Sequence, residues 1–316
     1  MKKVLKNLVP SIRPYLGDAF CFSIIDDVAF DSGWVYDKYI HIEYTPYDGQ
    51  IKYADYDYYD FVPDQGVFIK SFIEYPYKFC TQEVICNTIK RMIDNNEYCF
   101  ALWDETVVTN HLFHQEDEEI YEHGCFVYGY DDESEVFLSQ GYIQNERWEH
   151  FDVPFDVFYE AISYCPQKGE IALIGYKPRL EYEWKFDYDR MKKNMHIYME
   201  RGKENVGDNF YDINAVKSFF SNLEIGKIIH YPSLYCMYEH KVIFTRRLEF
   251  LLANHLFVNE EVVAQAKRIA KTYRKIMLLG IQYNASMDSR LLGVICDEVK
   301  KVVTEEREML MEIVLV

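Results

Sequence analysis

Residues 99–142 decide how this chain folds. They run CFALWDETVV over 99–108, then an acidic connection, then EHGCFVYGYDDESEVFLSQGY over 122–142. Apolar and aromatic runs bounded by polar turns predict three strands, which are 99–108, 124–130 and 136–139. The polar DDES segment predicts the turn between the last two. The stretch therefore predicts an antiparallel sheet, with His123 at the start of its middle strand.

His123 is the candidate general base. If the turn centres near residue 132, antiparallel pairing brings His123 opposite residues 139–141, so Gln140 could orient the imidazole. Asp104, at the end of the neighbouring strand, is the alternative orienting residue. A base held by an orienting partner is the arrangement that activates a nucleophile. The competing interpretation is that His123 only caps a strand.

A candidate nucleophile lies upstream. The segment AFCFSIIDDVAF predicts a helix over 19–30 capped by Asp18, which would place Cys21 in its first turn. The exposed N–H groups of a helix N-terminus favour the thiolate. Cys80, directly before a predicted helix over 81–95, is the rival nucleophile. The apolar neighbours of Cys21 also allow an ordinary buried thiol, and the sequence leaves these alternatives open.

Composition limits the classes of function. The chain has 316 residues, 49% of them hydrophobic, and a net charge of −18 at pH 7. This charge repels nucleic acid and anionic membranes and favours cationic partners such as amines. Eight cysteines without a CxxC pair exclude a zinc ribbon and predict reduced thiols in a cytoplasmic protein. We expect neither a signal peptide nor a membrane-spanning helix.

Two closely spaced histidines are candidate metal ligands. His111 and His114 are three residues apart, with acidic residues 116–119 nearby. No third fixed ligand is evident, so the segment predicts a solvated loop rather than a metal centre. We expect no metal and no cofactor.

The pattern changes character along the chain. The first part mixes strands and helices, whereas apolar stripes with helical spacing dominate from residue 187 onwards. These stripes predict five helices: 187–203, 212–223, 234–256, 260–283 and 289–314. The fold class expected is α+β, with one domain over 1–180 that carries the antiparallel sheet and a helical domain over 181–316.

The first domain resembles a papain-like group of proteins. Cys21, the segment EHGCFVYGYDD around His123 and the return strand VFLS from Val136 follow the order seen in that group. It includes the N-terminal domain of the butirosin acyltransferase and, more distantly, the peptidases that trim bacteriocin leaders. FALWDE and DVPFDVFYEA also look like their counterparts, so the resemblance covers residues 15–165. Residues 239–251 are similar to a recurring segment of proteins linked to thiotemplated biosynthesis. The chain also resembles the amide synthetase of closthioamide type, which offloads a carrier-bound precursor onto a diamine.

The resemblance implies an acyltransferase or amide synthetase. Cys21 would take an acyl group from the phosphopantetheine thioester of a carrier protein, and an amine or polyamine would resolve the acyl-enzyme with His123 as base. Separately from the resemblance, Arg246 and Arg247 form a polar cluster on a predicted helix. A solvated helix face is the main interpretation of this cluster, and docking of the phosphopantetheine arm is the alternative. We expect the helical half either to form a homodimer face or to cover the site.

The sequence departs from the papain-like pattern in two places. An Asp or Asn is expected at 139 or 140, where Ser139 and Gln140 stand. The glutamine that supplies an oxyanion donor upstream of the nucleophile is also missing before Cys21. A cysteine peptidase and a non-catalytic scaffold with a papain-like fold therefore stay open beside the acyltransferase.

Overall fold

The chain folds into two compact units. A computed structural model describes residues 1–54, 66–76, 79–108, 122–143, 147–163, 170–179, 181–200, 209–256 and 259–314. The sheet unit comprises Met1–Ser11, Ala19–Asp26 and Val62–Tyr182, and the helical unit comprises Ile12–Asp18, Asp27–Phe61 and Glu183–Val316. The last crossing between them, at 182/183, lies close to the division expected at 180/181. Segments 12–18 and 27–61 nevertheless belong to the helical unit.

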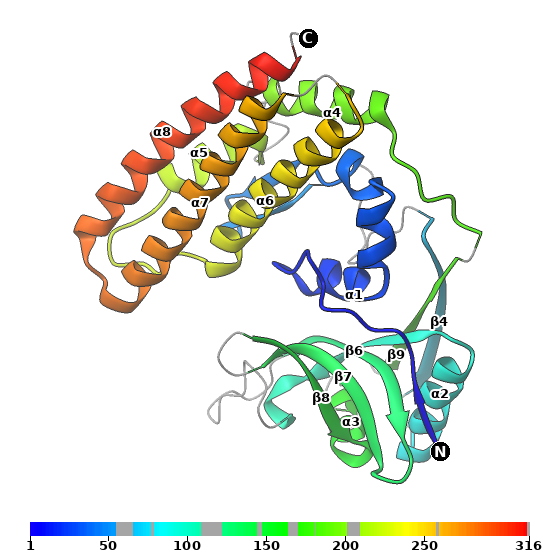
Figure 1. The fold of residues 1–316 in the computed structure, drawn as a ribbon. Helices are drawn as coiled ribbons and strands as arrows, with labels where there is room; N and C mark the ends of the chain where they lie inside the picture. The colour runs from blue at the N-terminus through cyan, green and yellow to red at the C-terminus, as the bar shows by residue number, and fades with distance from the viewer. Residues whose placement is uncertain are drawn as a thin grey trace. The chain divides into compact units, whose positions relative to one another are not determined.

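The sheet unit is built on one antiparallel sheet (Figure 1). Its strands run in the order β4-β9-β5-β6-β7-β8, and β1 pairs with the far part of β6. Their bounds are β1 Lys2–Val4, β4 Phe68–Pro76, β5 Tyr98–Asp104, β6 Glu122–Asp131, β7 Val136–Ile143, β8 Arg147–Pro154 and β9 Glu170–Pro178. The strands expected over 99–108, 124–130 and 136–139 are thus β5, β6 and β7.

Helices cover both faces of this sheet. On one face lie α2 (Gln82–Asp94) and α3 (Phe155–Ser163), packed on alternate residues of β5 and β6 such as Trp103 and Cys125. The α2 helix begins where the Thr81 hydroxyl accepts a hydrogen bond from Val84 N–H. On the other face lie residues 19–26 of α1 (Leu16–Asp31), with Phe20 stacked on Phe126.

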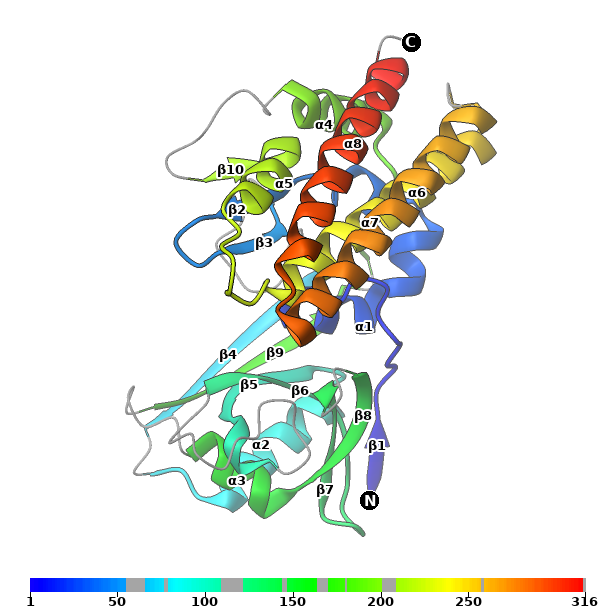
Figure 2. The same ribbon diagram turned by 90° about the vertical axis from the view of Figure 1, so that its left-hand side faces the viewer.

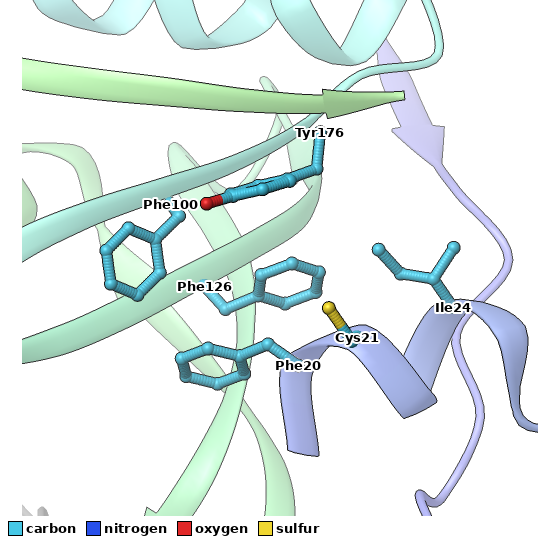
Figure 3. Close-up of a pocket in the computed structure, with 6 residues that line it drawn as sticks. All are labelled: Phe20, Cys21, Ile24, Phe100, Phe126 and Tyr176. Carbon is cyan, nitrogen blue, oxygen red and sulfur yellow. The ribbon is translucent and has the colours of Figure 1, made fainter. Parts of the chain in front are cut away.

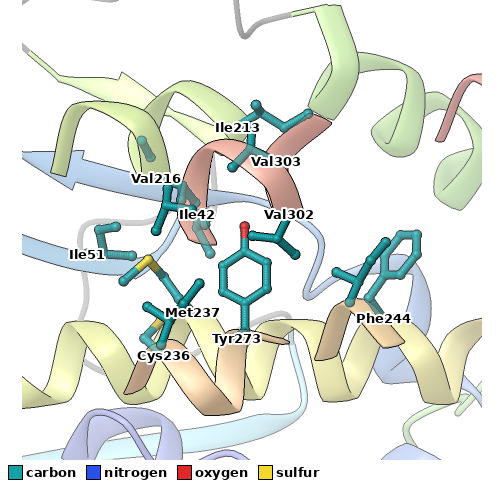
Figure 4. Packing of buried hydrophobic residues seen from close by; sticks show 14 of the residues in the cluster. Ile42, Ile51, Ile213, Val216, Cys236, Met237, Phe244, Tyr273, Val302 and Val303 are labelled. Atoms are coloured by element: carbon teal, nitrogen blue, oxygen red, sulfur yellow. The ribbon is translucent and has the colours of Figure 1, made fainter. Parts of the chain in front are cut away.

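In the described residues of the helical unit, the helices that follow residue 187 pack with a small sheet around one core (Figure 2). The helices are α4 Tyr188–Glu200, α5 Asp212–Ser221, α6 Tyr231–Ala253, α7 Glu260–Ser286 and α8 Ser289–Val314. The sheet joins β2 (Ile42–Thr45), β3 (Gln50–Tyr53) and β10 (Phe210–Tyr211) in the order β10-β2-β3, all antiparallel. Ile42 and Ile51 of this sheet belong to the same buried core as Tyr273 and Val302 (Figure 4).

These observations confirm the coarse fold class. The protein is mixed α/β, with an antiparallel sheet and a helical C-terminal part. Each of the five helical stripes expected after residue 187 corresponds to one of α4–α8. Within the described ranges, no helix combines the length and apolar character that crossing a bilayer requires.

Candidate functional site

A buried carboxylate and a partly exposed imidazole meet at one end of β5 and β6. His123 is the second residue of β6 and lies opposite Trp103 of β5. The chain leaves β5 at Asp104 and enters a short 3₁₀ turn, η3 (Glu105–Val107). That turn places Glu105 so that its Oε1 accepts a hydrogen bond from His123 Nδ1.

Asp104 builds the turn that positions this pair. Its Oδ1 accepts hydrogen bonds from the Thr106 backbone N–H at 3.0 Å and from the Thr106 hydroxyl at 2.7 Å. A carboxylate that caps the residue two positions on is a local way to start a turn. The prediction that Asp104 orients His123 is therefore wrong, because its neighbour Glu105 does so.

The pair has the geometry of a general base. Glu105 is fully buried, whereas 29% of the His123 side chain is exposed. A carboxylate that accepts from Nδ1–H fixes the tautomer, which leaves Nε2 of the neutral ring with a lone pair for a substrate proton. The carboxylate also stabilises the imidazolium that forms when Nε2 takes that proton.

Cys21 lies on the opposite face of the sheet. Its side chain is 2% exposed and sits in a small pocket lined by Phe20, Ile24, Phe100, Phe126 and Tyr176 (Figure 3). Paired residues of neighbouring strands share a face and consecutive residues alternate. Phe100 and Phe126 form one such pair. Trp103 and His123 form another pair, three residues further along each strand, and an odd step places it on the opposite face of the sheet.

Gly124 supports the same assignment of faces. A Cβ built there would come within 2.8 Å of the Phe100 ring and 3.8 Å of the Phe20 ring, on the side of α1. The adjacent residue, His123, therefore points to the side of α2 and α3. The structure thus does not bring Cys21 and His123 together, and the predicted catalytic dyad is wrong.

The position of Cys21 within α1 also differs from the expectation. The helix begins at Leu16 after Tyr15, so Cys21 is its sixth residue rather than part of the first turn. Tyr15 holds the N-cap position, and Asp18 is the third residue of the helix. Its Oδ1 accepts a hydrogen bond from the Tyr39 hydroxyl at 3.3 Å. Because only the first four N–H groups of a helix are left without helical partners, the expected activation of the thiol is lost.

Gln140 does not face His123 either. The β6–β7 register pairs Val127 with Ser139 and shifts at a bulge before Gly129. If the pairing of Val127 with Ser139 is continued by one residue along each strand, Gln140 lies opposite Phe126. Gln140 is buried, and its Oε1 accepts a hydrogen bond from Trp148 Nε1 at 3.3 Å. The prediction of Gln140 as the orienting residue is therefore also wrong.

Cys80, the rival nucleophile, is held at the far edge of the sheet. Its Sγ lies 3.5 Å from Pro76 O and 3.7 Å from Tyr75 O, both on β4. Strands β9 and β5 separate β4 from β6, which at about 4.8 Å per strand places β4 about 14 Å from the strand of His123. Burial raises the pKa of the Cys80 thiol. Both the position and the protonation state argue against a nucleophilic role.

The two arginines considered for docking have different surroundings. Arg247 is fully buried, and its guanidinium donates to Tyr36 O at 2.6 Å and Tyr39 O at 2.7 Å. It therefore holds the backbone of segment 34–39 and is not accessible to a phosphopantetheine arm, so that expectation is wrong for Arg247. The Arg246 guanidinium lies 3.8 Å from the centre of the Phe30 ring.

A second polar cluster lies buried in the helical unit. Lys241 Nζ donates to Glu306 Oε1 at 2.5 Å and to the Tyr198 hydroxyl at 2.7 Å. The Tyr273 hydroxyl donates to Glu306 Oε2 at 3.1 Å. All four side chains are at most 4% exposed. The cluster ties α4, α6, α7 and α8 together, and we assign it a structural role.

Metal binding has no support in the described part of the chain. There, no group of three His, Cys, Asp or Glu side chains is placed to hold an ion. His111, His114 and residues 116–119 lie outside the described residues.

The residue that sequence reasoning missed is Glu105. Its signal was present in the sequence as an acidic residue directly after a strand, next to an Asp that precedes Thr by two positions. An Asp at that spacing favours a turn, and in the structure this turn carries Glu105, whose side chain reaches His123 on β6.

Comparisons with models of known families and with curated proteins found no match for this chain.

Proposed function

We propose that this protein transfers an acyl group from a carrier-protein thioester to an amine by general-base catalysis, without an acyl-cysteine intermediate. His123 is the base and Glu105 is its positioning residue. The observation that carries the proposal is the hydrogen bond between the buried Glu105 carboxylate and His123 Nδ1. The resemblance of residues 15–165 to papain-like acyltransferases supports the reaction class, and the net charge of −18 favours a cationic acceptor.

The proposed step needs no group beyond substrate and base. The amine nitrogen attacks the thioester carbonyl carbon while His123 Nε2 removes a proton from that nitrogen. The tetrahedral intermediate then collapses, the C–S bond breaks, and the thiolate takes the proton from the imidazolium. One C–N bond forms and one C–S bond breaks. A thiol is a good leaving group, so direct aminolysis does not require a covalent enzyme intermediate.

The absence of Cys21 and Cys80 from the step follows from the positions of these two thiols. Cys21 lies across the sheet from the imidazole, and Cys80 is anchored at β4. A base must reach the proton that it removes, either directly or through one water. The proposal therefore keeps the acyl donor and amine acceptor expected from the resemblance and replaces the nucleophile.

The test uses an acyl thioester of N-acetylcysteamine with a diamine, and amide product is measured by mass spectrometry. We expect His123→Gln to abolish the protein-dependent rate, whereas Cys21→Ala keeps it. Glu105→Gln should lower kcat and leave KM nearly unchanged, because it removes the charge that stabilises the imidazolium but does not contact substrate. Retained activity in His123→Gln would remove the proposal.

A non-catalytic binding protein is the second candidate. Two observations favour it: Cys21 is buried among aromatic side chains, and burial raises the pKa of the Cys80 thiol. Both thiols therefore have the properties of ordinary core residues rather than of nucleophiles. In that case wild-type protein would bind an acylated carrier protein without forming amide. The same mass measurement, paired with a binding assay, separates the two candidates.

A further inference from the structure

A basic and apolar stripe runs along the exposed face of α7. Residues 262–286 contain five Lys or Arg and no Asp or Glu, in a protein whose net charge is −18. Five exposed residues at helical spacing form the stripe: Arg268, Lys271, Arg274, Leu278 and Ile281. The steps of three and four positions keep all of them on one side of the helix.

Among the described residues, the acidic side chains of the helices on either side form no ion pair with the three cations of this stripe. The neighbouring Lys267 and Lys275 form ion pairs with Glu249 at 2.7 Å and Glu298 at 3.0 Å. Across the described ranges, no ion pair involves Arg268, Lys271 or Arg274. Their charge is therefore not neutralised by α6 or α8, between which α7 packs (Figure 2).

The apolar end of the stripe is exposed. Leu278 is 52% exposed and Ile281 is 39% exposed, directly after the three cations. The buried side of the same helix, with Ile269, Tyr273 and Ile276, already serves the core. Leu278 and Ile281 thus add apolar surface that the packing of α7 does not need. A cationic row that ends in an apolar patch matches an amphipathic helix with carboxylates along one edge.

We propose that this stripe docks the carrier protein, and that the carrier presents an acidic helix with an apolar end. The inference rests on the proposed function for the identity of the partner. The stripe adds the chemical requirement that the partner surface be acidic. A nucleic acid or an anionic membrane is disfavoured, because such extended polyanions would also meet the acidic remainder of the protein.

The test measures binding of an apo acyl carrier protein of acidic net charge, which has no thioester and so excludes catalysis. The variant is Arg268→Glu, Lys271→Glu, Arg274→Glu. Its matched control, Lys300→Glu, Lys301→Glu, Arg307→Glu, reverses three exposed charges on α8. We expect the dissociation constant to rise at least about tenfold in the α7 variant and to change less than about twofold in the control. Thermal melting confirms that both variants fold.

A second variant checks the apolar end. Leu278→Ser with Ile281→Ser should weaken the same binding without changing net charge. Equal losses in the α7 and α8 charge variants, no binding by wild type, or tighter binding of a DNA duplex than of the carrier would each overturn the inference. Turnover of the N-acetylcysteamine thioester should be unchanged in the α7 variant, so a failure of the inference is distinguishable from a failure of the proposed function.

Discussion

Glu105 and His123 form a carboxylate–imidazole pair in which the acid is fully buried and the ring is partly exposed. The acid comes from a turn at the end of β5 and the ring from the start of β6, so two adjacent strands fix their relative position. Such a pair is held in one tautomer before substrate arrives, which is the preorganisation that general-base catalysis needs.

The roles of the two neighbouring acids are separable by substitution. Glu105→Gln should lower kcat by about 10²-fold, within the range that general-base catalysis contributes. Asp104→Asn keeps an oxygen that can accept from Thr106 and should lower kcat far less. The measurement is amide formation at saturating thioester. A larger loss in Asp104→Asn than in Glu105→Gln would contradict the assignment of Glu105.

The thiol of Cys21 should behave as a core residue. Cys21→Ala removes one buried sulfur from an aromatic pocket and should lower the free energy of unfolding by about 1 kcal/mol. Because the thiol is buried, iodoacetamide should label it in native protein much more slowly than in urea-unfolded protein. Peptide mapping of the labelled sites measures this ratio. Rapid native labelling confined to Cys21 would contradict the packing described here.

Glu239 should make stability depend on pH. It is buried and accepts hydrogen bonds from Arg13 N–H at 2.9 Å and the Tyr53 hydroxyl at 3.3 Å. Burial raises the pKa of this carboxyl well above its usual value. An acid whose folded-state pKa is raised favours the fold fully below its unfolded pKa, about 4.3, and this contribution is lost as pH rises toward the folded pKa.

The variant Glu239→Gln tests the direction in which stability changes with pH. The amide keeps the shape of the neutral acid and cannot ionise, so the variant should gain stability relative to wild type as pH rises above about 5, by at most about 1.4 kcal/mol per pH unit. Urea unfolding at pH 5 and pH 8 measures the change. A stability difference that stays constant between the two pH values would show that the folded and unfolded pKa values do not differ.

Replacing only one partner of the Lys241–Glu306 ion pair should strongly lower the free energy of unfolding. Lys241→Met leaves a buried carboxylate without its cation and should lower the free energy of unfolding by about 3–5 kcal/mol. The double variant Lys241→Met, Glu306→Leu should lose less than the sum of the two single variants, because no uncompensated charge then remains. Denaturant unfolding of the four proteins completes the cycle. Additive losses would mean that the two groups do not interact.

Much of the fold could be predicted from residue patterns. The strands around Phe100, Phe126 and Phe137 have apolar and aromatic runs, and the helices after residue 187 have clear apolar stripes. These signals are local, so a single sequence carries them. The mixed membership of the first 61 residues was not predictable, because the pairing of β2 with β10 joins residues more than 160 positions apart.

The candidate site was predictable only in part. His123 could be singled out, but its partner depended on register, and a bulge in β6 together with a turn over 132–135 moved the residues opposite it. The helix α1 begins at Leu16, and Asp18 within its first turn accepts a hydrogen bond from the distant Tyr39, a contact that local sequence patterns do not carry. Which face of the sheet receives α1 is also a tertiary outcome, and it separates Cys21 from the imidazole.

The central claim is that amide forms at His123 without an acyl-cysteine, and intact-mass analysis during turnover tests it most directly. Wild-type protein incubated with acyl thioester alone should keep its unmodified mass, and the Cys21→Ala, Cys80→Ala double variant should form amide at close to the wild-type rate. A stable acyl adduct on a cysteine of the wild-type protein, absent from the double variant together with its activity, would contradict the account.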